Sequence, residues 1–220
     1  MTARSEHDPR VGRPFARNRF LQGLMLAYAC VFVWSAIAPK YPRDWWLEML
    51  LAFVFVAVLV ATHRRFVFSN ASYALIALFL ALHTYGAHYT YAESAFGDWL
   101  KDALGHSRNH YDRIVHFSFG ALLVYPTYEI GRRVLHLRGG WAVAVPWLAI
   151  LALSGGYEIV EGWTARIVSP ELGTAYLGTQ GDEWDAQKDM SLANTGSLLA
   201  LAASALYRRF ASAEPWSLLE

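Results

Sequence analysis

The sequence has few cysteines, few charged residues and none of the short motifs that mark the best-known catalytic sites. Cys30 is the one cysteine among 220 residues, which excludes an intramolecular disulfide and a metal site made of cysteines. Only 17% of the residues are charged and 55% are hydrophobic, a balance too apolar for an ordinary soluble domain. The chain contains no HExxH, Walker A or GxSxG motif, no internal repeat and no low-complexity tract. These absences indicate one membrane-embedded domain whose chemistry must come from scattered residues.

Six apolar stretches dominate the chain. They cover roughly residues 20–38, 45–62, 72–89, 111–131, 141–162 and 189–207. At about 1.5 Å per helical residue, each stretch approaches the hydrocarbon thickness of a bilayer, about 30 Å. The first stretch ends in Ala-Ile-Ala, like a signal-peptide cleavage site, but it is long for a signal peptide and Pro39 follows directly, so we expect a retained helix. The sequence predicts an all-α polytopic membrane protein with a bundle of six transmembrane helices in residues 20–208.

The basic residues predict the orientation of this bundle. If the N-terminus is cytoplasmic, twelve Lys and Arg residues lie inside and seven outside, whereas five acidic residues lie inside and thirteen outside. Basic residues concentrate on the cytoplasmic side of membrane proteins. We therefore expect an N-in, C-in topology in a bacterial inner membrane. Residues 1–19 and 209–220 would be cytoplasmic tails, the first one basic and attracted to anionic lipid. The expected partner is the bilayer and not nucleic acid, since a DNA-binding arm is the weaker interpretation of the basic tail.

The composition of the apolar stretches also indicates which helices are central in the bundle and which face lipid. The last stretch is rich in small residues, which let membrane helices approach closely, so we expect this helix to be central in the bundle. The first two stretches carry almost no polar groups and are expected to be lipid-facing support. The two longest connections, about 90–110 and 163–188, lie on the outer side, and long ordered loops are more often functional than short ones.

Ionisable side chains gather at the outer ends of the last three stretches, where charge at membrane depth is costly unless it has a partner or a function. These residues are Asp112, His116, Glu158, Glu161, Asp182, Asp185 and Asp189. Neighbours within each group are three or four residues apart, which puts them on one helical face. His83 and His88 lie toward the same end of the third stretch but are five residues apart, so at most one of them is expected to join the group.

Carboxylates held at one depth repel one another unless a cation or shared protons neutralise them. A mixed His/Asp/Glu set suits Zn²⁺, Mn²⁺ or Fe²⁺, and an acid-only subset suits Mg²⁺ or Ca²⁺. We therefore expect a divalent metal ion as cofactor. Its predicted ligands are Asp112, His116, Glu158 and Asp189.

The remaining acids of the group are candidates for proton transfer, and each member also has a structural interpretation. The predicted general base is Glu161 or Asp185, with Asp182 beside them. Asp112 and Asp189 could instead complement helix N-termini, and His116 could be a packing residue. Arg113 and Arg166 could form ion pairs with the glutamates. The sequence leaves these alternatives open.

Three segments resemble the YjdF-type family of bacterial inner-membrane proteins. They are YDRIVHF at 111–117, YEIVE at 157–161 and LGTQGDEWDAQKDM at 177–190. The Leu-Gly-Thr-Gln-Gly-Asp part is the most specific, and the likeness runs over most of the second to sixth stretches. The family is uncharacterised, so the resemblance implies a location and carries little function with it.

A weaker similarity is to VanZ-like membrane proteins, which are linked to glycopeptide resistance. Those proteins have an Asp-x3-His-Phe helix, a helix with an acid followed by Gln, and a final Asp…Asn…Gly helix. Asp112 and His116 match the first element at the same spacing, and Glu158 matches the acid of the second. The chain departs at Glu161, where Gln is expected, and by one residue of spacing in 189–196. The similarity therefore implies a bacterial envelope setting more than a shared activity.

Three functions fit the sequence. The first is a metal-dependent hydrolase or transferase acting on an envelope lipid or lipid-linked substrate at the outer leaflet. The second is a binding or stress-response protein that holds a cation or ligand without turnover. The third is an ion- or proton-coupled transporter, which is disfavoured because the inner halves of the stretches lack polar residues and no inverted repeat is evident. The sequence does not indicate the oligomeric state.

Overall fold

The computed structural model describes residues 15–211, apart from the side chains of residues 208, 209 and 211. Most of the predicted tails, 1–14 and 212–220, therefore lie outside the described residues. The long helices are α1 (Arg19–Ala36), α2 (Pro42–Thr62), α3 (Asn70–Tyr89), α5 (Tyr111–Arg133), α6 (Trp141–Ile167) and α8 (Asp185–Ala211). The short elements are η1 (Phe15–Arg17), η2 (Tyr91–Glu93), α4 (Ala95–Leu104) and α7 (Pro170–Leu177). Within residues 15–211 the fold is all-helical, as predicted, and each apolar stretch corresponds to one long helix.

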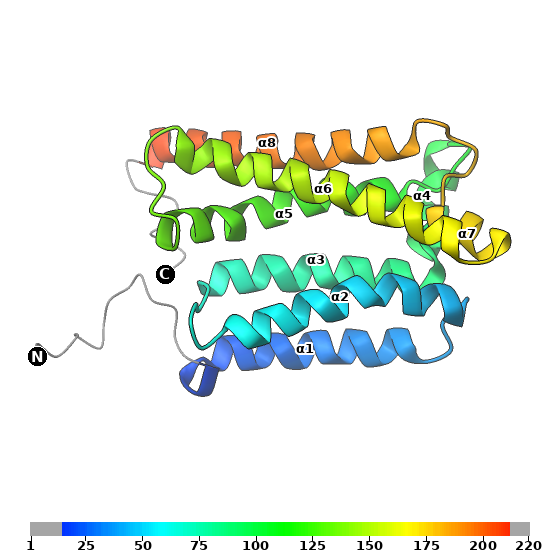
Figure 1. Ribbon diagram of the computed structural model, residues 1–220, viewed down its shortest axis with the longest axis horizontal. Coiled ribbons are helices and arrows are strands. Elements are labelled where there is room, and N and C mark those ends of the chain that lie inside the picture. The colour runs from blue at the N-terminus through cyan, green and yellow to red at the C-terminus, as the bar shows by residue number, and fades with distance from the viewer. Residues whose placement is uncertain (1–14, 212–220) are drawn as a thin grey trace, which may run out of the picture.

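The long helices run side by side along the longest axis of the molecule (Figure 1). The short helices α4 and α7 lie together at one end of this bundle, which we call the α4–α7 end. The first long helix begins, and the last one ends, at the opposite end (Figure 1). The two long connections of the sequence, 90–110 and 163–188, thus form folded structure at a single end.

Among residues 15–211, four helices are long and apolar enough to cross a membrane, namely α1, α2, α6 and residues Asp185–Tyr207 of α8. Helices α3 and α5 have 20 and 23 residues, a similar length, but both carry buried ionisable groups. Polar side chains lower the mean hydropathy of a helix even when they face other helices. The described chain is therefore a multi-helix membrane protein, and the count of six spans depends on how α3 and α5 are interpreted.

Helix α5, and not α8, is the central helix. It contacts α3, α6 and α8, whereas α8 packs one face on α5 and α6 and leaves the opposite face exposed, as at Leu198 and Leu199. The expectation of a central last helix is wrong, because small residues on one face need only one close neighbour. That neighbour is very close: a Cβ atom on Gly120 would lie 1.8 Å from the carbonyl oxygen of Ala193, and one on Gly196 would lie 2.2 Å from that of Phe117.

Local sequence sets the boundaries of the short helices at the α4–α7 end. The hydroxyl oxygens of Ser94 and Ser169 accept hydrogen bonds from the backbone at the first turns of α4 and α7. Both helices end at glycines in the left-handed region, Gly105 (φ 68°) and Gly178 (φ 58°). These caps turn the chain sharply where α4 and α7 end.

Candidate metal centre

Asp112 and His116 form the core of the candidate centre. They lie one turn apart near the start of α5, and Nε2 of His116 is 3.4 Å from Oδ1 of Asp112. Asp189, on the first turns of α8, faces them from across the α5–α8 contact. One ligand atom from each of these three residues lies within 4.8 Å of the other two. Asp189 is 2% exposed, so this group is buried in the bundle.

Helix α6 adds two glutamates to the group. Oε1 of Glu158 lies 3.7 Å from Nδ1 of His116, so the imidazole stands between the carboxylates of α5 and α6. Glu158 and Glu161 lie about one turn apart on α6, and their carboxyl groups interact electrostatically. Two such carboxyl groups repel each other unless they share a proton or a cation.

Helix α2 contributes a buried acid that the sequence analysis missed. Glu48 is 2% exposed and interacts electrostatically with Asp112 and His116. Asp44, one turn earlier, is fully buried and accepts a hydrogen bond from Thr90. The expectation that the first two helices are only lipid-facing support is therefore wrong for the start of α2. The signal was present in the sequence, since Asp44 and Glu48 are four residues apart at the N-terminal end of an apolar stretch.

Among the described residues, no Lys or Arg pairs with this group, and a protonated His116 is the cation within it. No Lys or Arg nitrogen described lies within 4.0 Å of the carboxylates of Asp112, Glu158, Glu161 or Asp189. One buried carboxylate oxygen on each of Glu48, Glu158 and Asp189 has no hydrogen-bond partner among the described residues. Buried carboxylate oxygens without a donor are costly, so this arrangement calls for a proton or a cation.

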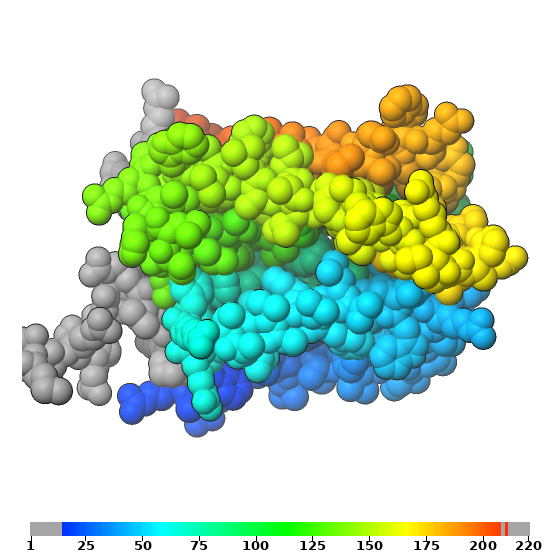
Figure 2. Space-filling model, in the orientation of Figure 1, coloured from blue at the N-terminus to red at the C-terminus, as the bar shows by residue number. Residues whose placement is uncertain are grey.

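A small cavity adjoins the group. It has a volume of about 10 Å³, room for about one water molecule. Its walls include Glu48, Asp112 and Glu161, together with the rings of Tyr91, Tyr157 and Tyr176. Helix α7 closes it from the side, where α7 contacts both α2 and α6, and Figure 2 shows these segments lying against one another on the visible face.

Asp182 and Asp185, the other predicted catalytic acids, lie in a separate network of ion pairs. Oδ1 of Asp185 accepts from Arg108 at 2.9 Å, and Oδ2 of Asp182 accepts from Arg113 at 2.5 Å. Lys188 donates to Asp182 at 2.6 Å. The hydrogen bond from Lys188 and the neighbouring Arg113 hold the pKa of the Asp182 carboxyl well below its usual range. Asp182 is therefore an ionised anchor that is poorly suited to take up a proton.

The loop before α8 fastens this network to the loop before α5. Backbone N–H of Asn109 donates to Oε1 of Gln180 at 3.0 Å, and Nε2 of Gln180 donates back to the carbonyl of Asn109 at 2.9 Å. Arg108 also donates to the carbonyl of Thr179 at 3.2 Å. The turn needs positive φ at Gln180 (50°) and Gly181 (83°). The Leu-Gly-Thr-Gln-Gly-Asp segment thus clamps the ends of α5 and α8 together.

Neither histidine of α3 is among the three ligand groups of the cluster. Nε2 of His83 lies 3.0 Å from the carbonyl of Glu48, which can only accept, and Nδ1 lies 2.5 Å from the hydroxyl of Tyr91. Both ring nitrogens of His83 are therefore used. His88 instead contacts the carbonyl of Ser35, and its ring packs against that of Trp34 at 4.4 Å between centroids. The structure also tests the alternative that Arg113 and Arg166 form ion pairs with the glutamates. Arg113 pairs with Asp182 and Asp185 instead, and Arg166 lies exposed.

Comparison with known proteins identifies the family of this chain. Residues 20–210, nearly all of the described structure, match the family described as "Predicted membrane protein (DUF2238)". The chain belongs to the DUF2238 family. It is 34% identical to the inner membrane protein YjdF of Escherichia coli (strain K12) over 174 residues, which cover 79% of this chain and 83% of that protein. No solved structure matches the chain.

This membership confirms the resemblance to YjdF-type proteins and the location in the bacterial inner membrane. The DUF2238 chain is a membrane protein with several apolar helices, as expected. Its buried Asp112, His116 and Asp189 form a group that could hold a metal ion.

Proposed function

We propose that the protein binds a divalent cation at the α4–α7 end of its bundle, with Asp112, His116, Glu158 and Asp189 as ligands. One observation carries the proposal: three ligand atoms from α5 and α8 gather within 4.8 Å, although no described Lys or Arg compensates their charge. A cation between them would give the unpartnered oxygens of Glu158 and Asp189 a ligand role. It would also offset the repulsion among carboxylates on three helices.

The ligand set favours a borderline transition metal. One imidazole with carboxylates suits Zn²⁺, Mn²⁺ or Fe²⁺ better than Mg²⁺ or Ca²⁺. Atoms that bind one ion at about 2.1 Å lie at most about 4.2 Å apart. The 4.8 Å spread of Asp112, His116 and Asp189 would thus have to shrink by at least roughly 0.6 Å on binding, through rotation of the side chains.

The cation would stand at the outer face of a six-helix bundle with both termini in the cytoplasm. Two observations support this topology: α3 and α5 are long enough to span the bilayer, and their ionisable groups are buried against other helices. The basic residues of the described connections 63–69 and 134–140 lie at the end opposite to the acidic cluster. That distribution agrees with the positive-inside rule.

For the activity we propose a metal-dependent hydrolase or transferase that acts on an envelope lipid or lipid-linked substrate. A bound cation would polarise a phosphoryl or acyl oxygen or activate water. Glu161 is the favoured general base, because it shares with Asp112 a cavity of about one water molecule. Asp185 and Asp182 are weaker candidates for proton transfer, since both are bound to arginines.

Cation binding without turnover is the second candidate, and the size of the cavity favours it. About 10 Å³ admits water or an ion but no lipid headgroup, so a substrate would require α7 to move. A transporter is less well supported. Glu129, the buried acid toward the other end of α5, is thirteen residues or about 20 Å beyond His116, and the buried Leu123 and Val124 lie between them.

Metal loading of the purified protein tests the proposal. The full chain in detergent is stripped with a chelator, incubated with Mn²⁺ or Zn²⁺, and the bound metal is measured by mass spectrometry. We expect about one ion per chain in the wild type, and affinity at least about tenfold lower in Asp189→Asn and His116→Ala. Asp102→Asn, an exposed acid on α4, removes the same charge and serves as control.

The outcomes separate the candidates. A wild type that binds no stoichiometric metal, or an Asp189→Asn variant that binds as tightly as the control, would contradict the metal centre. A metal-loaded protein that turns over no envelope lipid extract would favour the binding protein over the enzyme.

Reporter fusions at Glu220 test the topology separately. We expect a reporter that is active in the cytoplasm to work there, and one that needs the periplasm to stay inactive. A periplasmic result would contradict the N-in, C-in topology with six spans.

A further inference from the structure

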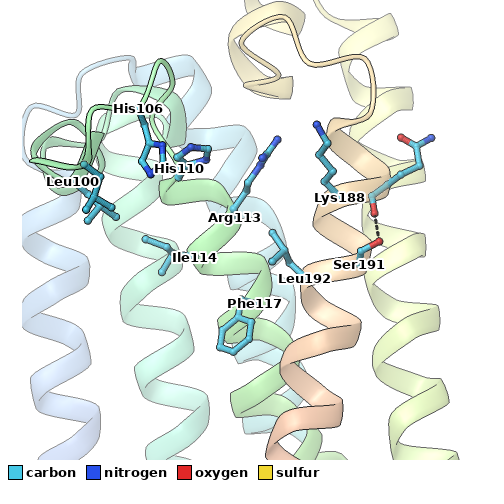
Figure 3. Close-up of a pocket in the computed structure, with 11 residues that line it drawn as sticks. Leu100, His106, His110, Arg113, Ile114, Phe117, Lys188, Ser191 and Leu192 are labelled. Carbon is cyan, nitrogen blue, oxygen red and sulfur yellow. Dashed lines mark hydrogen bonds between the residues drawn. The ribbon is translucent and has the colours of Figure 1, made fainter. Parts of the chain in front are cut away.

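The structure assigns a second binding site, a groove between α4, α5 and α8 that we infer takes one anionic phospholipid of the bilayer. The groove has a volume of about 700 Å³ and carries basic side chains at its upper end and apolar ones below (Figure 3). It includes neither Asp189 nor His116. A lipid with a phosphate headgroup and an acyl chain has the same division into an anionic and an apolar part.

The upper end of the groove has an excess of positive charge. His106, His110, Arg113 and Lys188 line it, and in Figure 3 Arg113 and Lys188 point away from the apolar part. The network behind this rim contains three permanent cations, Arg108 included, against two carboxylates. Lys188 is 48% exposed, so its ammonium can donate to a further acceptor besides Asp182.

The lower part of the groove follows the helix axes into the depth of the bilayer. Ile114, Phe117 and Leu192 line it, from one turn of α5 and the facing turn of α8 (Figure 3). Residues Asp185–Tyr207 of α8 meet the length and apolarity of a membrane span. An acyl chain lying here would remain at the depth of the surrounding lipid tails, and burying its methylenes against these side chains is favourable.

Helix α4 sets the level of the rim at the membrane surface. Its large apolar residues Phe96, Trp99 and Leu104 are exposed, although α4 is only 10 residues long and cannot span a bilayer. An exposed Trp beside charged residues is typical of a helix that lies at the headgroup level. The basic rim, held between α4 and the first turns of α5 and α8, therefore lies where lipid phosphates are.

The site is independent of the proposed metal centre. Asp112 and His116 lie on the face of α5 toward α6, whereas Arg113, Ile114 and Phe117 lie on a different face toward α4 and the outer side of α8. Asp189→Asn should remove the metal centre without weakening lipid binding, because it takes away a negative charge that acts on Arg113.

Native mass spectrometry of the full chain, titrated with phosphatidylglycerol or phosphatidylcholine in detergent, tests the inference. We expect one tightly retained phosphatidylglycerol per chain, weaker by about fivefold in Lys188→Gln. Lys40→Gln is a matched control: Lys40 lies at the same end, is 47% exposed and also donates to one carboxylate at 2.6 Å. Leu192→Trp, which fills the groove, should abolish retention of the single lipid, whereas Leu198→Trp on the exposed face of α8 should not.

Three results would overturn the inference. They are equal retention of the two lipids, equal effects of the Lys188 and Lys40 variants, and undiminished retention in Leu192→Trp. Thermal melting of each variant confirms that it is folded, so that loss of lipid is read only from folded protein.

Discussion

The contact between α5 and α8 gives the sharpest prediction about stability. A Cβ atom added at Gly120 would lie 1.8 Å from the backbone oxygen of Ala193, whereas an ordinary contact needs at least 3.4 Å. The obstacle is backbone and cannot rotate away, so α5 and α8 would have to separate by roughly 1.6 Å. Overpacking of this kind costs typically 1–3 kcal/mol, and we expect Gly120→Ala to lie at the upper end, about 3 kcal/mol. For a chain of this length that is a fall of roughly 10 °C in Tm.

Thermal unfolding in detergent, followed by circular dichroism and by size-exclusion chromatography, measures this effect. Gly23→Ala is the matched control, because a Cβ atom there meets nothing within 4 Å on α1. Alanine is the better helix former by about 1 kcal/mol, so the control should be unchanged or slightly more stable. Gly120→Ala should also lose bound metal, since His116 lies one turn away and Asp189 is on the displaced helix. Equal melting temperatures for the two variants would refute the argument that backbone contact fixes this pair of helices.

Two further variants test the two ends of the bundle. Glu129→Gln should destabilise the protein by about 2 kcal/mol in urea unfolding. The carboxylate accepts hydrogen bonds from Ser69 and Ser72 and pairs with Arg133, whereas the NH₂ group of glutamine would face these donors as a donor itself. An unchanged midpoint would contradict this. For Asp182 the folded pKa is lowered, so its contribution to stability is complete above the ordinary aspartate pKa of about 4 and is lost as the pH falls through the lowered value. The wild type should therefore lose its advantage in Tm over Asp182→Asn as the pH falls below about 4. A Tm difference that persists in acid would show that the ion pairs of Asp182 are not its cause.

Much of the fold was predictable because a membrane span is a one-dimensional signal. Each apolar stretch of the sequence became one long helix, since backbone groups in lipid must bond within their own segment. The pairing of Asp112 with His116, and of Glu158 with Glu161, followed from helical periodicity alone. The common depth of these residues followed from residue counts along each helix, and the structure brings Asp112, His116, Glu158 and Asp189 together.

The limits of sequence reasoning appear where helices meet. Nothing in the order of residues distinguishes acids that contact arginine from acids that do not. Contact with arginine is nevertheless what separates Asp182 and Asp185 from the candidate metal centre. Glu48 lines one cavity together with Tyr176 of α7, a residue more than a hundred positions away in the sequence.

The sequence by itself determined an all-helical membrane protein of the DUF2238 family with acids and a histidine at one end. Hydrophobic length, periodicity and family motifs depend only on neighbouring residues, so they are visible in the chain. Tertiary structure alone decided that α5 is central, that α8 lies at the edge, and that a basic-rimmed groove opens beside α4. Those features depend on which faces pack together and which charges find partners, and packing is decided by contacts between segments distant in sequence.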